Sequence, residues 1–509
     1  MEQLRLTLDE TTRGGPPPPG VRRTRAVAIR NVYDAAAQTR RTVGWRAPTV
    51  SPNRAVLPYL TTLRDRSRTA VRNDGYAKGA IDYLVSNIIG TGIKPLSQAV
   101  DADLRKAIQA LWLRWTDQTD ADGLLDFYGQ QAQATRCWLE AGECFIRFRF
   151  RSPNDGFVVP LQLQVIEPEL CPHTYDRVLP NGNRVRAGIE RDRVGRRVAY
   201  HVHPSRPTDT DDFDAGTLVP LAADTIIHLY DPLRPGQLRG LPHLAAGLVK
   251  FWELDKFDDA TLLRQQLANL FVAFLTRPEG TSEHDAVHPL TGLATSGTDP
   301  DKPSLLFEPG IFQELSPGED VKFSTPPDAG AMYPAFMRQQ LQSALTAAGV
   351  PYHAVTGDMS NLNDRVVRVI LHDFRRRVQM MQHQIVAFQL CRRVWEVWMR
   401  QVYVMGLLPL PADFMVDSWP WAAVAWSPQG WPYLHPVQDV QAQREAIRAG
   451  LTSRQAVVSE HGEDAEAIDQ AQADDNARAD ELGLAYDSDG RRARGAAGKA
   501  DADDATKQE

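Results

Sequence analysis

Cysteine is scarce in this chain, and the few cysteines are widely spaced. The four cysteines, Cys137, Cys144, Cys171 and Cys391, are scattered and form no C-x-x-C pair. A disulfide framework and a zinc knuckle both depend on closely paired cysteines, so the sequence indicates neither. We therefore expect free thiols and a reducing compartment.

Long apolar runs are also missing, although 43% of the residues are hydrophobic. No stretch approaches the roughly 18 apolar residues that a membrane-spanning helix needs. The N-terminus carries arginines and the run Pro16–Pro19 but no apolar signal-peptide core. We expect a chain that neither spans a membrane nor carries a signal peptide, and that folds into roughly two or three units with buried cores.

An excess of positive charge is absent as well. The formal net charge is -7 and the sequence pI is about 6.0. Proteins that wrap nucleic acid through many phosphate contacts carry clustered Lys and Arg, so this class is excluded. Any contact with DNA should be local or loose.

Motifs of nucleotide and nucleophile chemistry are missing. No G-x-x-x-x-G-K-[ST] loop occurs; the stretch Gly90–Pro95 lacks the Ser or Thr that would hold magnesium, and it follows a helical pattern. We interpret it as a helix stop. Cys171 and His173 lie two apart in an expected loop, which favours a buried thiol over a nucleophile and its base.

Two weaker patterns leave an enzymatic alternative open. Glu140 and Glu143 flank a glycine at a helix-to-strand corner and could form an acidic pair, although capping and solvated charge explain them equally well. His201 and His203 share one face of an expected strand, where an ordinary strand surface is the simpler interpretation. The alternative function is a metal-dependent DNA-processing enzyme that uses these residues.

The first half of the chain has the pattern of an α+β domain. Apolar residues recur at helical spacing and then at a spacing of two. The expected helices cover 56–96, 103–115 and 127–140, and the expected strands cover 145–150, 161–166, 184–191, 197–203 and 225–230.

The second half is mostly helical. After Gly240 one helical pattern reaches about Arg277, and a helix of that length measures on the order of 50 Å, the reach of a strut. Turn residues then bound two short apolar runs, Leu305–Phe307 and Val321–Phe323, which predict a small β insertion. The remaining helical segments are 329–348, 364–404 and 437–482, with breaks at Gly450 and Gly462, and a turn-rich stretch covers 349–363.

A basic stripe lies on the long helix that follows residue 363. Arg365, Arg368, His372 and Arg375 fall at spacings of three and four, with Arg376 adjacent. Two interpretations stay open: salt bridges to an adjacent subunit, or electrostatic contact with a passing phosphate backbone.

Short motifs in a fixed order resemble those of one protein family, the portal proteins of tailed bacteriophages of the lambda type. The motifs are Arg64-Asp65-Arg66-Ser67-Arg68, residues 72–80, Asn87–Ile93, Glu140-Ala141-Gly142-Glu143, Val165–Pro168, Gly188–Glu190, Ile227–Tyr230, Arg234–Gly240, Gly349–Tyr352 and Thr356–Asp358. Matching pieces extend from about residue 55 to 470. The family usually has a small, Ser- and Ala-rich segment where this chain has Asn363–Ile370, so we expect the start of the long helix to pack differently here.

The resemblance implies a structural subunit without catalytic residues or cofactors. Such proteins form a ring, commonly of about twelve subunits, at one capsid vertex. It serves as the conduit for packaging and ejection of double-stranded DNA, without sequence specificity. The implied partners are a terminase motor, the major capsid protein or scaffold, and head-tail connector proteins. The implied location is the virion, with assembly in the host cytoplasm. A minor capsid scaffold without a channel is a further alternative.

The resemblance also implies a portal fold with an α/β wing, a helical stem, a β-rich clip, a long kinked helix and a helical crown. The expected regions are a flexible arm (1–55), wing (56–242), stem helix (243–277), clip (278–328), second stem helix (329–348), channel loop (349–363), long helix and return to the wing (364–436), crown (437–484) and disordered tail (485–509).

Candidate site residues follow from this assignment. The DNA-channel candidates are Thr356, Asp358, Ser360, Asn361, Asn363, Arg365 and Arg368. The subunit-interface candidates are His372, Arg375 and Arg376.

Overall fold

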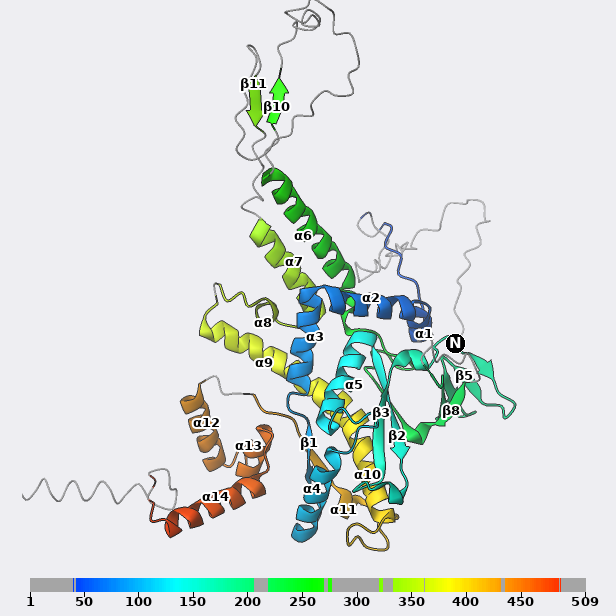
Figure 1. The fold of residues 1–509 in the computed structure, drawn as a ribbon, viewed down its shortest axis with the longest axis vertical. Coiled ribbons are helices and arrows are strands. Elements are labelled where there is room, and N and C mark those ends of the chain that lie inside the picture. Colours follow the sequence, from blue (N-terminus) through cyan, green and yellow to red (C-terminus); the bar gives the residue numbers. More distant parts are fainter. Residues whose placement is uncertain are drawn as a thin grey trace, which may run out of the picture. The chain divides into compact units, whose positions relative to one another are not determined.

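A computed structural model describes most of the chain (Figure 1). The described residues are 40, 43–205, 218–269, 273–276, 320–323, 333–360, 362–431, 435–484 and 486. The predicted strand at 305–307, most of the predicted arm, nearly all of the predicted tail, and the candidate Asn361 lie outside them. The chain divides into two compact units, residues 1–51 and 52–509, and every element below belongs to the second. Within the described residues, no helix combines the length and the apolar character that crossing a bilayer requires.

The N-terminal helices are shorter than predicted because Asp74 interrupts them. α1 (Pro52–Val56) and a 3₁₀ turn (Leu57–Tyr59) lead into α2 (Leu60–Asn73) and α3 (Gly75–Ile88). Asp74 has extended backbone angles, and its carboxylate accepts hydrogen bonds from the amides of Tyr76 (2.7 Å) and Ala77 (3.1 Å). This N-cap starts a new helix, so the single run predicted over 56–96 was wrong. The helix stop predicted at Gly90 is confirmed, and strand β1 (Lys94–Ser97) follows it.

Two antiparallel sheets follow helices α4 (Ala102–Thr116) and α5 (Phe127–Ala141). The three-stranded sheet has the order β3-β2-β9, and the five-stranded sheet has the order β4-β5-β6-β7-β8. The bounds are β2 Glu143–Phe150, β3 Leu161–Ile166, β4 Arg177–Val178, β5 Arg184–Arg186, β6 Ile189–Arg191, β7 Arg197–Val202, β8 Val219–Ala222 and β9 Ile226–Tyr230. The single strand predicted over 184–191 was wrong, because Ala187 and Gly188 take positive φ and turn the chain into a hairpin.

Two helices lie side by side as a strut, α6 (Leu248–Asn269) and α7 (Tyr333–Ala347) (Figure 1). The helix predicted to reach Arg277 was wrong at its end, because β10 (Ala273–Thr276) pairs antiparallel with β11 (Asp320–Phe323). In this pairing the backbone N–H and C=O groups of β10 form hydrogen bonds with β11 instead of the hydrogen bonds that they would form within a helix. It confirms the predicted strand at 321–323.

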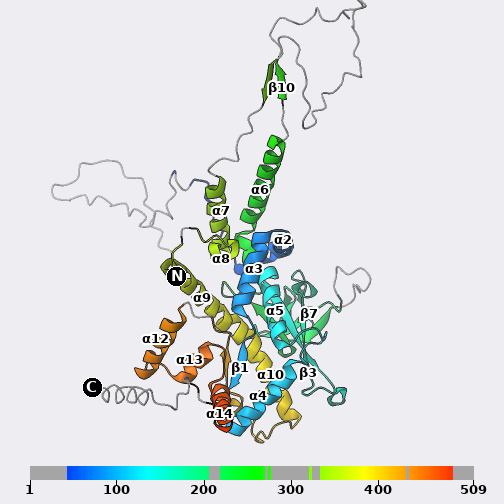
Figure 2. The same cartoon turned by 60° about the vertical axis from the view of Figure 1, so that its left-hand side comes forward.

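One long helical run leads away from the strut (Figure 2). After the short α8 (Tyr352–Thr356), α9 (Asp364–Met381) continues through a π-helical segment (Gln382–Cys391) into α10 (Arg392–Val404). The helix predicted over 364–404 is therefore confirmed. Within the π-helical segment, Gln389 exchanges two hydrogen bonds with the backbone of Tyr230, at 3.0 and 3.1 Å, which ties the run to strand β9.

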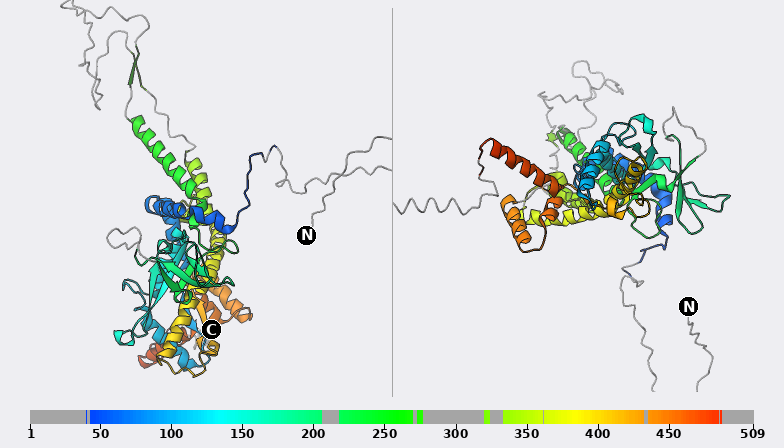
Figure 3. Two further views of the ribbon diagram at one scale, coloured as in Figure 1. Left: turned by 90° about the vertical axis from the view of Figure 1, so that its right-hand side faces the viewer. Right: turned by 90° about the horizontal axis from the view of Figure 1, so that it is seen from below.

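The C-terminal part returns to the first half of the chain and ends in helices. α11 (Trp419–Ala422) precedes β12 (Val424–Ser427), which pairs with β1. The helices predicted over 437–482 are confirmed as α12 (Pro436–Arg448), α13 (Arg454–Glu460) and α14 (Ala465–Glu481), with turns at Gly450 and Gly462 (Figure 3).

The main core joins the long helical run to the first helices. Trp112 of α4 contacts Trp395 and Trp398 of α10, with ring centroids 5.1 and 5.0 Å apart, and Phe127 of α5 at 5.3 Å. All four rings are buried. Packed aromatic rings of this size dominate the energetics of a core, so residues about 280 positions apart hold one another in place.

The turn between α5 and β2 generates the first prediction. Gly142 has a φ of 92°, and a Cβ there would lie 2.4 Å from the carbonyl carbon of Leu241, whereas Gly156 has a φ of 83° with open space around it. We expect Gly156→Ala to cost about 1–2 kcal/mol of stability from its backbone alone. Gly142→Ala should lower the melting temperature several times more than Gly156→Ala does, because the backbone at Leu241 must also move to make room for the added Cβ. Equal shifts in thermal unfolding followed by circular dichroism would contradict this close approach.

Candidate functional site

A buried carboxylate, Glu143, lies at the first residue of β2. Helix α5 ends at Ala141, and the left-handed Gly142 turns the chain so that the side chain of Glu143 points inward with no exposed surface. Its carboxylate pairs with the guanidinium of Arg64 from α2 and accepts hydrogen bonds from Arg239 Nε at 2.7 Å and from the amide of Gly240 at 2.9 Å. His228 of β9 donates from Nε2 at 2.8 Å. We name these four side chains (Arg64, Glu143, His228 and Arg239) the ion cluster.

Two guanidinium groups determine the charge state of this cluster. Burial alone would raise the pKa of Glu143, but the positive charges of Arg239 and Arg64 and the hydrogen bond from His228 hold that pKa well below its usual value. Burial lowers the pKa of His228 to about 4, so its ring is neutral near pH 7. Arg197 lies 3.1 Å from Nδ1 of that ring, which fits a proton on Nε2.

Arg239 extends the ion cluster to the second sheet. Its guanidinium donates hydrogen bonds to the carbonyl oxygens of Cys171 and Ala187, both at 2.9 Å. Arg64 likewise donates to the carbonyl oxygen of Ala141, at 3.0 Å. The ion cluster therefore connects α2, the end of α5 and both sheets, and its members are occupied by one another and by backbone groups. This arrangement supports a structural role.

The residues of the enzymatic alternative are not brought together. Glu140 binds Arg136 at 3.2 Å instead of approaching Glu143. His201 is buried against Glu190, with 3.1 Å between Nε2 and the carboxylate. In the described part of the chain, no group of three or more His, Cys, Asp and Glu side chains is placed to hold a metal ion. The thiol of Cys171 is buried, and that burial raises its pKa, as expected for an inert cysteine.

The predicted channel loop is fastened to the strut through Asp358. Its carboxylate pairs with Arg338 of α7 at 2.8 Å and accepts hydrogen bonds from the hydroxyl of Tyr352 at 3.0 Å and the amide of Ser360 at 3.1 Å. The two hydrogen bonds from Ser360, followed by that of Tyr352 and the charge of Arg338, lower the pKa of Asp358 to about 2. Thr356 accepts from the amide of Asp358 at 3.3 Å.

The loop ends at a capped helix. The side chain of Asn363 accepts a hydrogen bond from the amide of Val366 at 2.9 Å and so starts α9. Arg368 pairs with Asp364 at 2.8 Å, one helical turn away, while Arg365 is exposed. The capping side chain of Asn363 explains why α9 begins at Asp364.

The three interface candidates have different surroundings. The guanidinium of Arg375 lies over the ring of Trp431, 5.3 Å from its centroid, and is half-buried. His372 and Arg376 are exposed on α9. The basic residues of the predicted stripe thus differ in their surroundings. Arg368 and Arg375 contact other side chains of this chain, whereas Arg365, His372 and Arg376 are exposed.

The ion cluster generates a prediction about stability. Glu143→Gln keeps the shape of the side chain but leaves Arg64 and Arg239 buried without their counter-charge. We expect it to lower the free energy of unfolding by about 3–5 kcal/mol. The matched change Glu140→Gln removes a partly exposed partner of Arg136 and should cost about 0–1 kcal/mol. Urea unfolding followed by tryptophan fluorescence measures both; a Glu143→Gln variant as stable as Glu140→Gln would show that the cluster is not structural.

Comparison with known proteins agrees with the order of the motifs. Residues 38–382 match the family described as phage portal protein, lambda family. The chain is 25% identical over 479 residues to the probable portal protein of Halomonas phage phiHAP-1, covering 89% of this chain and 87% of that protein. It is 19% identical over 468 residues to portal protein B of Escherichia phage lambda, covering 83% and 85% of the two chains.

Among solved structures, a chain from the neck of a native GTA particle computed with C12 symmetry is 13% identical, with a TM-score of 0.44, covering 78% of this chain and 91% of that one. The family match spans more than half of the present sequence and includes the motifs that supply Arg64, Glu143, His228 and Arg239. The chain belongs to the lambda family of phage portal proteins.

Proposed function

We propose that this portal protein is one subunit of a closed ring, of about twelve copies, that conducts double-stranded DNA during packaging and ejection. Family membership supplies the general role. The observation that carries the proposal for this chain is the strut of α6 and α7, which presents large apolar side chains to solvent when the subunit is alone.

The strut is covered by its own chain on one side only. Phe257 of α6 packs against Phe336 and Tyr333 of α7, with centroids 5.1 and 6.0 Å apart. Elsewhere on α6, large apolar side chains are more than half exposed: Val249 (68%), Trp252 (57%), Leu262 (58%) and Leu263 (55%). Burying one such side chain stabilises an assembly by about 1.5–3 kcal/mol, so neighbouring copies around an axis are the occupants we propose.

The regional assignment that we propose rests on the resemblance to the family and places the strut in the stem. We assign the wing to 56–242, which includes both sheets, and the stem to 243–277 and 329–348, which include α6 and α7. The clip comprises 278–328, and β11 belongs to it. The long helix and return comprise 364–436, and the crown comprises 437–484 with α12 to α14. Residues 1–55 are the proposed arm and 485–509 the proposed tail.

The proposed channel surface is the loop 349–363 and the start of α9. The candidates that would face DNA are Thr356, Asp358, Ser360, Asn361, Asn363, Arg365 and Arg368. A conduit must hold DNA sideways without gripping it lengthwise, because each phosphate neutralised by a fixed cation adds counterion-release affinity and hence friction. The pairing of Arg338 with Asp358 and of Arg368 with Asp364 supports low friction, because it reduces the number of unpaired cations.

The exposed side of α9 is the second surface that we assign to subunit contacts. His372 and Arg376 are exposed and could pair with carboxylates of a neighbour, and Arg375 would support them through its contact with Trp431. The proposed docking partners of the ring are a terminase motor, the major capsid protein or scaffold, and head-tail connector proteins. Its proposed location is the portal vertex of the virion, after assembly in the host cytoplasm, without membrane, cofactor or catalytic residue.

Ring formation tests the proposal. Purified protein should give closed rings with an axial hole in electron micrographs and a single subunit number by native mass spectrometry. Trp252→Asp places a charge on the uncovered side of α6 and should reduce the ring fraction at least about tenfold, because burying an unpaired carboxylate is costly. The control Val194→Asp changes an apolar side chain that is 93% exposed on a hairpin turn and should leave rings intact. Persistent monomers of the unchanged protein under several conditions would refute the proposed ring.

The channel loop gives a separate test. Asp358→Lys adds a cation where the loop would face DNA and also removes the partner of Arg338. We expect rings to form normally while the yield of nuclease-protected packaged DNA falls several-fold, most strongly at low salt, since the added affinity depends on counterion release. The control Asp65→Lys changes an exposed carboxylate of α2. Packaging equal to that of the control would favour a capsid scaffold without a channel.

A further inference from the structure

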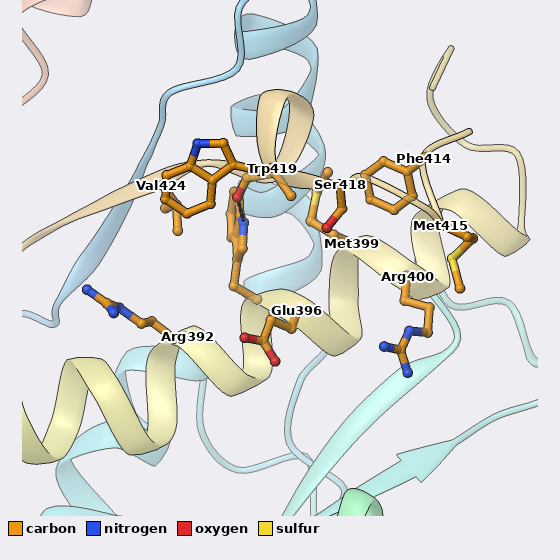
Figure 4. A pocket seen from close by; sticks show the side chains of 11 residues that line it. Arg392, Glu396, Met399, Arg400, Phe414, Met415, Ser418, Trp419 and Val424 are labelled. Atoms are coloured by element: carbon orange, nitrogen blue, oxygen red, sulfur yellow. Dashed lines mark hydrogen bonds between the residues drawn. The ribbon is translucent and has the colours of Figure 1, made fainter. Parts of the chain in front are cut away.

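A pocket of about 400 Å³ lies between α10 and the segment 414–424 (Figure 4). Its floor is apolar: Trp395, Met399 and Phe414 line it and are each at most 3% exposed. The indole N–H of Trp395 donates a hydrogen bond to the carbonyl oxygen of Ala422 at 2.8 Å, which fixes α11 opposite α10. The walls of the pocket are therefore held in place by the packing of α10 against the segment 414–424.

The rim of the pocket has exposed apolar side chains that the isolated subunit leaves uncovered. Trp419 is 76% exposed and Met415 is 53% exposed, and both line the pocket from the segment 414–424. Val416, next to them in the chain, is 90% exposed. Protein-protein contacts are enriched in exposed tryptophan and methionine beside a buried apolar floor, because such residues give large contact areas and adapt in shape.

The same rim carries positive charge at its two ends. Figure 4 shows Arg392 and Arg400 along α10 with Glu396 between them. The carboxylate of Glu396 forms a salt bridge with Arg393, with 3.1 Å between Oε2 and Nη1. Within the described residues, neither Arg392 nor Arg400 has a carboxylate at salt-bridge distance, and Arg392 lies over the ring of Phe388. The pocket is thus complementary to a segment that combines apolar anchors with carboxylates.

The chain itself contains such a segment after its last helix. Gly483 takes a φ of 65° and ends α14, and the apolar residues that surround it alternate along the sequence. Leu482, Leu484 and Tyr486 are 64%, 46% and 56% exposed. Glu481, Asp487 and Asp489 supply carboxylates on both sides of these anchors. We name residues 481–489 the anchor segment.

The direction of α14 favours a pocket on another copy. The helix is held at its start by the pair of Glu466 with Arg105 of α4, at 2.9 Å. In the views of Figures 1 and 3, α14 then runs outward, away from α10 and the pocket of its own chain. In a closed ring each subunit has two neighbours, so a segment that leaves its own subunit in this way is available to another copy.

We propose that the pocket between α10 and residues 414–424 receives the anchor segment of a neighbouring copy. Leu484 and Tyr486 fill the apolar floor beside Trp419, and the carboxylates of the segment pair with Arg392 and Arg400. The contact latches the C-terminal end of one subunit to the next, in addition to the contact through the strut. It rests on the proposed ring, because it requires a second copy at a fixed position.

Photo-crosslinking of the full-length protein tests this latch. Tyr486 is replaced by p-benzoylphenylalanine, whose excited ketone inserts into nearby C–H bonds, and the products are separated on a denaturing gel and mapped by mass spectrometry. We expect a crosslink between two copies, located in the peptides that contain Met415 and Trp419. The same replacement at Tyr59, an exposed tyrosine of the N-terminal 3₁₀ turn, is the matched control and should not label those peptides.

Charge reversal at the rim of the pocket is the second test of the latch. The double variant Arg392→Glu, Arg400→Glu should reduce the crosslink yield about tenfold, because attraction becomes repulsion at both ends of the rim. The control Arg66→Glu, Arg72→Glu reverses two exposed arginines of α2 and should not change the yield.

Native mass spectrometry of the same samples separates this latch from the ring itself. Rings without the crosslink, or with a crosslink elsewhere, contradict the latch and leave the ring standing. A crosslink within one chain shows that the segment folds back on its own pocket and also contradicts the latch. The absence of rings contradicts the proposed function, and the latch with it.

Discussion

The carboxylate of Glu143 is the point at which the two sheets and the first helices meet. Arg64 reaches it from α2, Arg239 reaches it from the loop before the strut, and both guanidinium groups also bond backbone oxygens of other elements. One buried charge without partners would cost several kcal/mol, but with two cations and His228 it fixes the relative positions of four segments. Because Arg239 lies only nine residues before α6, this cluster also fixes the chain close to the start of the strut.

The strut is less completely covered by its own chain than the sheets and the long helical run are. The aromatic core around Trp112 and Trp398 joins the long helical run to α4, and the ion cluster joins the two sheets to α2, both through contacts within the chain. The strut differs, because α6 leaves several large apolar side chains in solvent. The contacts that hold the subunit together and the apolar surface that we propose to face a neighbour therefore lie in different elements.

The sequence predicted the long periodic elements and the helix breaks at Gly90, Gly450 and Gly462, but it missed the interruptions at Asp74 and Ala187. α4, α5 and the run 364–404 follow from apolar spacing alone, but the break at Asp74 depends on one capping side chain inside a continuous helical pattern. The end of α6 was misjudged because the apolar residues 270–275 fit a helix and a strand equally well, and only pairing with β11 distinguishes the two. Glu143 was singled out as an acidic residue, yet its role could not be foreseen, since Arg64 and Arg239 lie far from it in sequence. All three occur in the motifs that indicated the family, and those motifs were the available signal.

The arrangement of the strut around an axis is the central claim, and a side-chain-resolution cryo-electron microscopy map of the assembled ring tests it most directly. The account predicts that Trp252 and Leu263 are buried against the neighbouring α6–α7 pair and that residues 356–363 line the axial hole. A ring in which the strut faces solvent, with that loop away from the axis, would contradict it.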